Sequence, residues 1–285
     1  MVHIILVNYN GWKVTCECIS SLKRMENREW HAVIVDNASA DGSLAELEKA
    51  YALDGQVSVV SAGANLGFAG GTNLGIRCAL AQGAEWILLL NNDTEVPADF
   101  LDRMTEKADR ESIFAPRISL FSDRAAVWYA AGYIDFRTGT VKNGDPSRGG
   151  EVSFASGCCM LFSPEVFSRI GEFDEDYFMY YEDVDFCLRA REAGVRIVYL
   201  PEAAVFHKVG RTTGGEQSKF SIYYNNRNRF YILRKYHFGA IAVFYTAVTR
   251  ALRWTAGILT GGNDRVILQA YRDYRKGISG KKENL

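Results

Sequence analysis

Apolar runs and helix-like patterns alternate through the first hundred residues of the chain. Four nearly continuous apolar runs predict buried strands, at residues 2–7, 32–36, 57–60 and 86–90. Three segments between them have apolar residues at helical spacing, at 11–25, 41–51 and 69–82. Strands without polar alternation that take turns with helices are typical of a mainly parallel sheet covered on both faces. The pattern therefore predicts an α/β fold.

The pattern becomes less regular after Ile113. Short strand-like pieces surround a turn at residues 137–140, and a polar, glycine-rich loop at 143–150 has the character of a flexible lid. Further along we predict a strand at 154–162, a short helix from Pro164, a helix that ends at Ala193, a strand at 196–200 and a loop that carries His207. From Ser218 onward the apolar spacing predicts three helices.

Polar, small or acidic residues follow each of the first four predicted strands. They are Asn8, Tyr9 and Asn10, then Asp36 and Asn37, then Ala62 and Gly63, and last Asn91, Asn92 and Asp93. Ligands of parallel sheets bind beyond the carboxyl ends of the strands, so these residues are candidates for a binding site. Asp93 can hold a divalent cation there, although an Asn/Asp turn is also common after any strand. Asp36 can bind a nucleoside base or ribose, or it can take part in capping the next helix.

Two further segments carry candidate binding residues. Residues 65–75, NLGFAGGTNLG, place several glycines before a predicted helix, as phosphate-binding loops do, but they match neither the G-x-G-x-x-G nor the P-loop pattern. His207 follows an apolar strand and precedes a loop of glycine and threonine. A lone histidine is more often structural than a metal ligand, and both interpretations remain open for His207.

Three carboxylates gather in the segment YYEDVDFCLRAREA, at Glu182, Asp183 and Asp185. Repulsion between neighbouring carboxylates disfavours their ionised forms and raises the pKa of at least one of them. A carboxylate with a raised pKa can accept a proton near neutral pH, which is the task of a general base. The alternative is a group of solvated acids stabilised by a helix N-terminus.

Composition and charge divide the chain into two parts. Residues 1–205 contain 18 Lys and Arg against 30 Asp and Glu, a net charge of −12, whereas residues 206–285 contain 15 against 4, a net charge of +11. Such a basic tail suits an anionic membrane surface, a phosphorylated ligand or nucleic acid. The six cysteines lack the paired spacing of a zinc site, and the short apolar run that ends at Asn8 does not resemble a signal peptide. We therefore expect free thiols and a cytoplasmic location.

The tail also contains an uncharged run of 12 residues at 238–249. A membrane-spanning helix needs about 20 apolar residues, so this run is too short to span. Two interpretations remain open. The tail is either a helical subdomain packed on the rest of the chain, with or without an oligomer contact, or an amphipathic anchor at a membrane surface.

An ordered set of motifs extends across residues 7–214. It reads VNYNG, IVDNASADGS, ANLGFAGGTNLGI, LLLNNDTEV, GEFDEDYFMYYEDVDFCLRAREAG and FHKVGRTTG. This set resembles the family 2 glycosyltransferases with the GT-A fold, and within them the rhamnosyltransferase-like enzymes of bacterial surface polysaccharide synthesis. The resemblance implies a GT-A catalytic domain at residues 1–215 and a basic, helical extension at 216–285.

The resemblance also implies a role for each matched residue. Asp183 matches the general base, with Glu182 beside it. Asp93 matches the metal-binding carboxylate of a D-x-D motif whose first position is Asn91 here, and His207 matches a late histidine that completes the metal shell. The implied cofactor is Mg²⁺ or Mn²⁺. The segments that match the donor-nucleotide site contain Val7, Asn8, Tyr9, Asn10, Asp36, Asn65, Gly71, Asn73 and Asn92.

The implied activity is that of an inverting glycosyltransferase in bacterial surface polysaccharide synthesis. It would move a sugar, in first place L-rhamnose, from a nucleoside diphosphate to a glycan or a polyprenyl-linked glycan. dTDP-rhamnose is the favoured donor and a UDP-sugar the alternative. We expect no nucleic-acid partner, and a cytoplasmic location with peripheral contact at the inner face of the plasma membrane. A homo-oligomer remains an open alternative.

Two other functions compete with this one. A sugar-phosphate nucleotidyltransferase shares the α/β nucleotide-binding fold, but it would need a basic, glycine-rich loop near the N-terminus, which residues 8–12 do not provide. A non-catalytic sugar-nucleotide-binding module would not need Asp93, Asp183 and His207, all of which are present.

Overall fold

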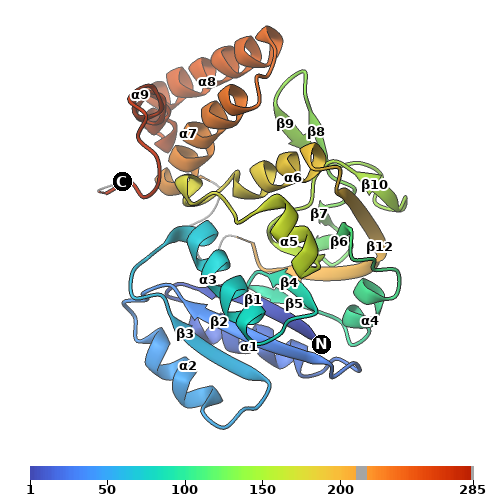
Figure 1. The fold of residues 1–285 in the computed structure, drawn as a ribbon. Coiled ribbons are helices and arrows are strands. Elements are labelled where there is room, and N and C mark those ends of the chain that lie inside the picture. Colours follow the sequence, from blue (N-terminus) through green and yellow to red (C-terminus); the bar gives the residue numbers. More distant parts are fainter. Residues whose placement is uncertain (210–216, 284–285) are drawn as a thin grey trace.

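The computed structural model describes residues 1–209 and 217–283. A large mixed sheet runs through it, with helices on both faces (Figure 1). The strands lie in the order β10-β12-β6-β11-β4-β1-β2-β3, with β5 beside β12 and β7 beside β6, and β8 and β9 form a separate hairpin. The predicted boundary between residues 215 and 216 lies outside the described residues and stays a prediction.

The strands are β1 (Val2–Asn8), β2 (Trp30–Asp36), β3 (Val57–Ser61), β4 (Trp86–Leu90), β5 (Thr94–Glu95), β6 (Ser112–Leu120), β7 (Val127–Tyr129), β8 (Tyr133–Asp135), β9 (Thr140–Lys142), β10 (Gly150–Val152), β11 (Cys159–Phe162) and β12 (Arg196–His207). The helices are α1 (Trp12–Leu22), α2 (Ser43–Tyr51), α3 (Gly67–Ala81), α4 (Phe100–Thr105), α5 (Pro164–Ile170), α6 (Glu182–Glu192), α7 (Lys219–Lys235), α8 (Ala240–Thr260) and α9 (Val266–Arg275). Short 3₁₀ turns occur at Glu175–Tyr177 and Asn263–Arg265.

The N-terminal half has the parallel arrangement that the apolar pattern predicts. β1 pairs in parallel with both β2 and β4, and β2 pairs in parallel with β3. Further along, β6 and β12 form another long parallel ladder, and the antiparallel strand β11 joins the two halves of the sheet. The central strands are buried on both faces, which explains why they lack polar alternation. The carboxyl ends of β1, β2 and β4 therefore meet at one edge.

Two predictions of strands were wrong. The predicted strand at 154–162 is a strand only at Cys159–Phe162, because the segment before it turns, with the Cys159 N–H donating to the carbonyl of Ser156 at 3.1 Å. The predicted strand at 196–200 does not end at Leu200 but continues as β12 to His207. Its pairing with β6 shifts in register between Leu200 and Ala204, and this irregularity accommodates Pro201, which cannot donate to the ladder. His207 consequently ends a strand and does not lie in a loop.

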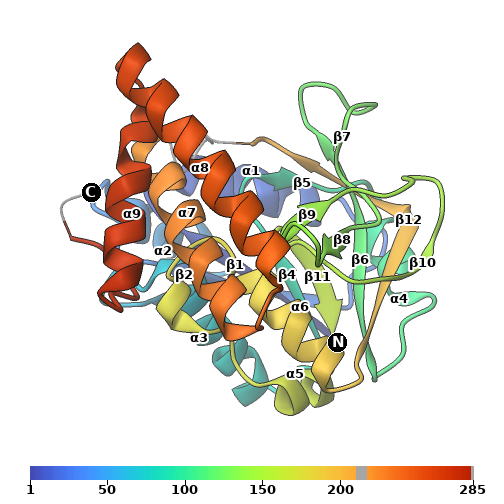
Figure 2. The ribbon, with the colours of Figure 1, turned by 90° about the horizontal axis from the view of Figure 1, so that it is seen from above.

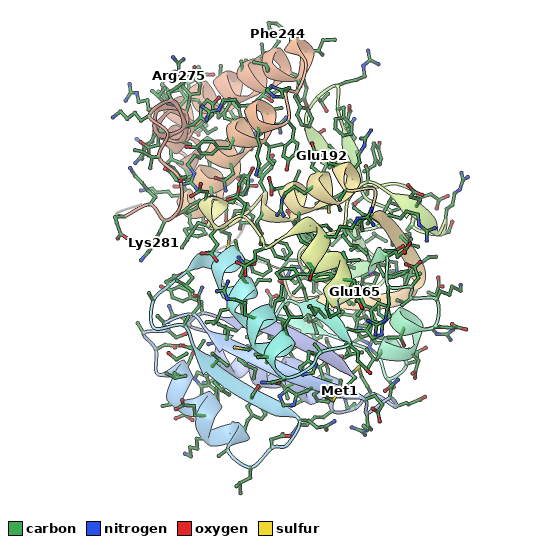
Figure 3. The ribbon with its side chains drawn as sticks, in the orientation of Figure 1. Met1, Glu165, Glu192, Phe244, Arg275 and Lys281 are labelled. Atoms are coloured by element: carbon green, nitrogen blue, oxygen red, sulfur yellow. The ribbon has the colours of Figure 1, made fainter. Side chains whose placement is uncertain are left out.

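The C-terminal helices α7, α8 and α9 lie at one end of the molecule, seen from above in Figure 2. Helix α7 packs closely on the rest of the chain, since Ile232 and Leu233 belong to the same hydrophobic core as the central sheet. Helix α8 is largely exposed, and its outer end carries Phe244, as Figure 3 shows. Among the described residues, no helix is long and apolar enough to cross a membrane.

Candidate active site

A chain of hydrogen bonds joins the carboxyl ends of β1, β2 and β4. The Asn8 side-chain amide donates to Asp36 Oδ1 at 2.8 Å, and its carbonyl accepts from the Thr15 hydroxyl at 2.8 Å. The Asn92 amide donates to the same hydroxyl at 2.9 Å. All these polar groups are buried, so each must find a partner, and together they fix the three strand ends relative to one another.

Asp36 is further held by the turn that follows β2. The Ser39 N–H donates to Asp36 Oδ2 at 3.0 Å, and the Ser39 hydroxyl donates to Oδ1 at 2.6 Å. The backbone N–H of Asn10 donates to the same hydroxyl at 2.9 Å, while the Asn10 side chain accepts from Ala40 at 2.8 Å. Asp36 thus organises its own turn and does not cap α2. Tyr9 and Asn10 lie at the accessible rim of this network.

The glycine-rich segment is the beginning of α3, which starts at Gly67, and not a free loop. Asn65 precedes it and accepts from the Gly67 N–H at 3.0 Å and from the Asn37 amide at 3.2 Å. Gly71 lies against Val7 at the end of β1, where an added Cβ would come within 2.9 Å of a Val7 methyl carbon. The glycine at this position therefore allows α3 to approach the sheet closely.

Asn73, which the sequence predicted to contact the sugar-nucleotide donor, instead holds two segments of the protein together. It is fully buried in α3, and its amide donates to the carbonyl of Phe173 and to Glu175 Oε1, both at 2.9 Å. Its carbonyl accepts from the Phe173 N–H at 2.9 Å. All of its polar atoms are used in holding the segment before α6 onto α3, so we do not include Asn73 among the donor-binding residues.

Asp93 and His207 lie beside one another beyond β4 and at the end of β12. Asp93 Oδ1 lies 3.1 Å from His207 Nε2, and both side chains are buried. Burial lowers the pKa of His207, but the neighbouring Cys158 and the Asp93 carboxylate outweigh that effect and raise it to about 11. Among the described residues, Asp93 Oδ1 makes this ion pair but no hydrogen bond of regular geometry, and His207 Nδ1 makes no hydrogen bond. A buried polar atom without a hydrogen bond is rare, and in a neutral His207 this nitrogen would be available to a metal.

The donor chemistry of this pair fits Mg²⁺ or Mn²⁺, which accept carboxylate oxygen and, for Mn²⁺ especially, imidazole nitrogen. Within residues 1–209 and 217–283 there is no group of three or more His, Cys, Asp or Glu side chains that could hold a metal by itself. Magnesium is commonly bound by one or two protein ligands together with substrate phosphates, so a pair of this kind suits a metal that arrives with its substrate.

The turn at Ser156, Gly157 and Cys158 connects this pair to the acidic cluster. The Cys158 carbonyl accepts from the Asn91 N–H at 2.8 Å, on the metal-candidate side. The Gly157 N–H donates to Asp183 Oδ2 at 3.0 Å, on the acidic side. The apolar pattern predicted a strand here, so the turn was missed. The small residues in ASGCC were the available signal, because they favour a turn over a strand.

The three acids of the cluster have different surroundings. Asp185 is fully buried and forms ion pairs with Arg189 at 2.8 Å and with Lys235 of α7 at 2.7 Å, so its role is structural. Glu182 is buried, and one of its oxygens has no hydrogen-bond partner among the described residues. Burial, followed by the nearby charges of Asp183 and Asp185, raises the pKa of Glu182 well above its usual value.

Asp183 is the partly accessible member of the cluster. Burial of its carboxylate raises its pKa, although the N–H groups of Gly157 and Val184 oppose this by donating to it. The predicted rise in pKa is thus present in Asp183 and in Glu182; burial is the first cause at both, and repulsion within the cluster adds to it at Glu182 but not at Asp183. A partly accessible carboxylate with a raised pKa has the properties of a general base.

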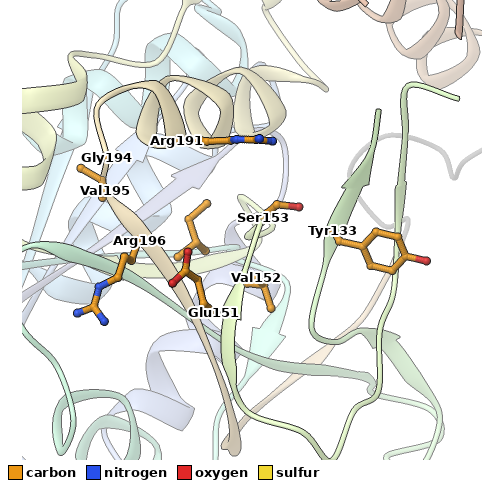
Figure 4. A pocket seen from close by; sticks show the side chains of 9 residues that line it. Tyr133, Glu151, Val152, Ser153, Arg191, Gly194, Val195 and Arg196 are labelled. Carbon is orange, nitrogen blue, oxygen red and sulfur yellow. The ribbon is translucent and has the colours of Figure 1, made fainter. Parts of the chain in front are cut away.

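A surface cavity lies elsewhere. It has a volume of about 590 Å³ and opens between the start of β12, the end of α6 and the β8–β9 hairpin, where Figure 4 shows Arg191, Arg196, Glu151 and Tyr133 around it. His207 is at the opposite end of the 12-residue strand β12, so this cavity is separate from the metal-candidate pair.

The fold is similar to that of solved glycosyltransferases of the GT-A class. One is S. aureus TarS, residues 1–349, in complex with UDP-GlcNAc, with a TM-score of 0.64 and 18% identity over 97% of this chain and 81% of that one. Another is GalNAc-T7 with UDP, GalNAc and Mn²⁺, with a TM-score of 0.61 and 17% identity over 73% of this chain and 43% of that one. These similarities establish the GT-A fold.

The family follows from the sequence comparison. The model of Glycosyl transferase family 2 matches residues 3–171, and the chain belongs to this family of glycosyltransferases. It is 28% identical to the low-salt glycan biosynthesis hexosyltransferase Agl10 of Haloferax volcanii, over 91% of this chain and 81% of the relative. It is 26% identical to the dTDP-rhamnosyl transferase RfbF of Shigella flexneri, over 92% and 90%. It is also 26% identical to an N-acetylglucosaminyl-diphospho-decaprenol L-rhamnosyltransferase of Mycobacterium tuberculosis, over 74% and 77%.

Proposed function

We propose that this glycosyltransferase moves L-rhamnose from dTDP-L-rhamnose to a polyprenyl-linked glycan, with inversion at the anomeric carbon. The observation that carries the proposal is Asp183, a partly accessible carboxylate with a raised pKa, held by the same turn that holds Asn91. The rhamnosyltransferases among the relatives support the choice of sugar, and the decaprenol-dependent relative supports the lipid-linked acceptor. A UDP-sugar is the alternative donor, since TarS is seen with UDP-GlcNAc.

The residues of the chain have distinct tasks in this proposal. The network of Asn8, Asp36 and Asn92 holds the strand ends at which the nucleoside would bind, with Tyr9 and Asn10 at its rim. Asp93 and His207 would hold Mg²⁺ or Mn²⁺, which supplies positive charge against the diphosphate as it leaves. To hold the metal, His207 would have to be neutral and so to have given up the proton that it shares with Asp93.

Asp183 then acts on the acceptor. Its carboxylate removes the proton from the attacking hydroxyl while that oxygen forms a bond to the anomeric carbon and the bond to the diphosphate breaks. The electron pair of the broken bond remains on the diphosphate oxygen. A single displacement by one base gives an inverted product. Glu182, which burial favours in its protonated form, adds no second negative charge beside the base.

We also propose that the protein docks on an anionic membrane surface through α8. Its exposed apolar side chains recur at helical spacing and form a stripe, which we call the α8 stripe: Ile241, Phe244, Tyr245, Val248, Leu252 and Leu259. Phe244 is 70% and Leu259 86% exposed. Arg272 and Arg275 of α9 and Lys276 directly after it are exposed and add positive charge to the same C-terminal part of the chain. Apolar contact combined with basic charge favours an anionic lipid surface, where a polyprenyl-linked acceptor also lies.

A donor panel tests the proposed activity. The protein is incubated with Mn²⁺ and, in separate samples, with dTDP-L-rhamnose, UDP-glucose, UDP-GlcNAc and GDP-mannose, and the melting temperature is compared with that of the protein and Mn²⁺ alone. We expect dTDP-L-rhamnose to raise it most, because a ligand stabilises the state that binds it. Each donor is then supplied with a synthetic polyprenyl-diphosphate-linked GlcNAc, and the lipid fraction is analysed for added sugar and its anomeric configuration.

The competing functions give different outcomes. A nucleotidyltransferase would transfer no sugar to the acceptor in this panel, and in a separate sample it would form a sugar nucleotide from a nucleoside triphosphate and a sugar 1-phosphate. A binding module would show the thermal shift without transfer to the acceptor. Transfer with retained configuration would contradict the single displacement by Asp183.

A further inference from the structure

The segment that leads into the acidic cluster of Glu182, Asp183 and Asp185 has an unusual backbone. Phe178, Tyr180 and Tyr181 have φ angles of +64°, +66° and +74°, in the left-handed region that residues with side chains rarely adopt. Tyr181 is the N-cap residue of α6 and directly precedes Glu182 and Asp183. Such conformations cost free energy and persist only when the surrounding structure holds them. The neighbours of this segment must therefore stabilise it.

The side-chain amide of Asn228 in α7 faces three carbonyl groups of this segment, which share its two N–H donors. The side chain is fully buried, and its amide nitrogen lies 2.9, 2.8 and 2.7 Å from the carbonyl oxygens of Tyr177, Met179 and Tyr180. These three carbonyls converge on one amide nitrogen because Phe178 and Tyr180, which lie between them, have positive φ angles. An extended chain would turn alternate carbonyls in opposite directions.

Arg227, the preceding residue, holds the beginning of the same segment. It is also fully buried, and its guanidinium donates to the carbonyl of Tyr177 at 3.0 Å and to that of Asp176 at 3.2 Å. It donates as well to Gly280 near the C-terminal end of the described chain, at 2.6 Å. A buried guanidinium costs free energy unless its donors are satisfied, and here backbone carbonyls provide that satisfaction.

Helix α3 holds the segment from the other side. The Phe178 carbonyl accepts from the Phe68 N–H at 2.7 Å, in the first turn of α3. Gly67 allows this approach, since an added Cβ there would lie 2.2 Å from the Phe178 carbonyl oxygen. The segment is therefore clamped between α3, which lies at the donor edge of the sheet, and α7 of the C-terminal helices, which lies beside it in Figure 1.

We propose that Asn228 and Arg227 are positioning residues for Asp183, so that the C-terminal helix α7 completes the active site without touching the substrates. They fix the positive φ angles of Phe178, Tyr180 and Tyr181, and this conformation sets where α6 begins and where its first turn directs Asp183. Lys235 of the same helix holds α6 by its ion pair with Asp185. The inference rests on the proposed role of Asp183 as the base.

The test compares Asn228→Ala and Asn228→Asp with Asn226→Ala. Asn226 is a matched control because it is also buried in α7, yet its amide donates to Ile222 of its own helix at 2.6 Å. Turnover is followed as release of the nucleoside diphosphate from dTDP-L-rhamnose, or from UDP-glucose if that is the donor used. We expect both Asn228 variants to lower kcat by about 10- to 100-fold, as small displacements of a catalytic group do, with KM for the donor little changed. The Asp variant keeps the side-chain shape but replaces the N–H donors by a buried carboxylate oxygen that repels the three carbonyls, so we expect its effect to be at least as large as that of Ala although the packing volume is kept.

Hydrogen exchange supplies a readout that does not depend on activity. Amides of residues 178–186 should exchange faster in both Asn228 variants and at the wild-type rate in Asn226→Ala. The proposal is overturned if hydrogen exchange in this segment is the same in the Asn228 variants as in the wild type. It is also overturned if Asn226→Ala lowers kcat as much as the Asn228 variants do while all these variants have equal melting temperatures. If the wild-type protein releases no nucleotide from any donor while the exchange result is as expected, the proposed function has failed and the clamp itself stands. Should Asn228→Ala not fold, Arg227→Lys, which keeps the charge and loses the planar fork, is measured in the same way.

Discussion

At the scale of single residues, Asp183 is the group on which the proposed chemistry depends. Asp183→Asn keeps the shape of the side chain but cannot accept a proton, so we expect transfer to fall by about 10²- to 10⁴-fold. Donor affinity should be unchanged, because the donor edge is built by other strands. Calorimetry with the donor and a transfer assay on the same preparation measure the two effects. Near-normal turnover by the variant would remove Asp183 from the role of base.

Asp93 and His207 are the two residues proposed to hold the metal ion. Asp93→Ala should weaken metal-dependent binding of the donor by about tenfold or more, and His207→Ala should do so less severely, because the carboxylate supplies the charge that the cation requires. Donor affinity is measured by calorimetry with Mn²⁺ and again with EDTA. Binding that neither the chelator nor either substitution changes would rule out a metal held by this pair.

Glu182 links the site to the stability of the fold. Its pKa is higher in the folded protein than in the unfolded chain, so the stability it contributes is present below its unfolded pKa near 4 and is lost as the pH rises through its folded pKa. Glu182→Gln has no such loss. We therefore expect the variant to gain free energy of unfolding relative to the wild type between pH 5 and pH 8.

Urea unfolding at the two pH values measures this change, with Glu48→Gln, at an exposed position of α2, as the control. A difference between Glu182→Gln and the wild type that stays constant with pH would show that Glu182 is already ionised in the folded protein.

At the scale of elements, the start of α3 is in close contact with the segment before α6. Gly67 and Gly63 have nearly equal φ angles of +73° and +70°, but only Gly67 faces the Phe178 carbonyl, while nothing lies within 4 Å of a Cβ at Gly63. Both substitutions by Ala place a side chain in the left-handed region, so the difference between them reports the clash alone.

We expect Gly67→Ala to lower the free energy of unfolding by about 1–3 kcal/mol more than Gly63→Ala, as overpacked sites do. Urea unfolding measures both variants. Equal effects would mean that α3 and the Phe178 segment separate without cost.

At the scale of the whole molecule, the charge division and the α8 stripe predict where the protein docks. It should sediment with anionic vesicles more than with neutral ones, and binding should weaken as salt rises, because the Debye length falls from about 10 Å at 0.1 M to about 3 Å at 1 M. The double variant Phe244→Ser, Leu252→Ser should lose most of this binding while transfer to a water-soluble acceptor continues. Leu53→Ser, at a fully exposed leucine outside the C-terminal helices, is the control.

Negligible binding to both kinds of vesicle would contradict membrane docking. A concentration-dependent dimer that the double variant abolishes would instead assign the α8 stripe to a contact between copies of the chain, which was the alternative left open by the sequence.

The sequence by itself determined the sheet and most of the candidate site. Continuous apolar runs require strands buried on both faces, and parallel strands bring their carboxyl ends together, so the pattern alone places Asn8, Asp36 and Asn92 at one edge. The pairing of Asp93 with His207 came from the family resemblance, because spacing along the chain does not reveal contacts between distant strands.

Only the tertiary structure decided how the acidic cluster is divided. Three acids within four residues look equivalent in sequence, yet Asp185 is neutralised by Arg189 and by Lys235 from α7, while Asp183 remains partly accessible. Likewise, the sequence around Asn228 does not indicate that this residue contacts the backbone before α6, some fifty residues earlier in the chain. Burial and long-range partners set the pKa and the direction of a side chain, and these arise only when distant segments pack together.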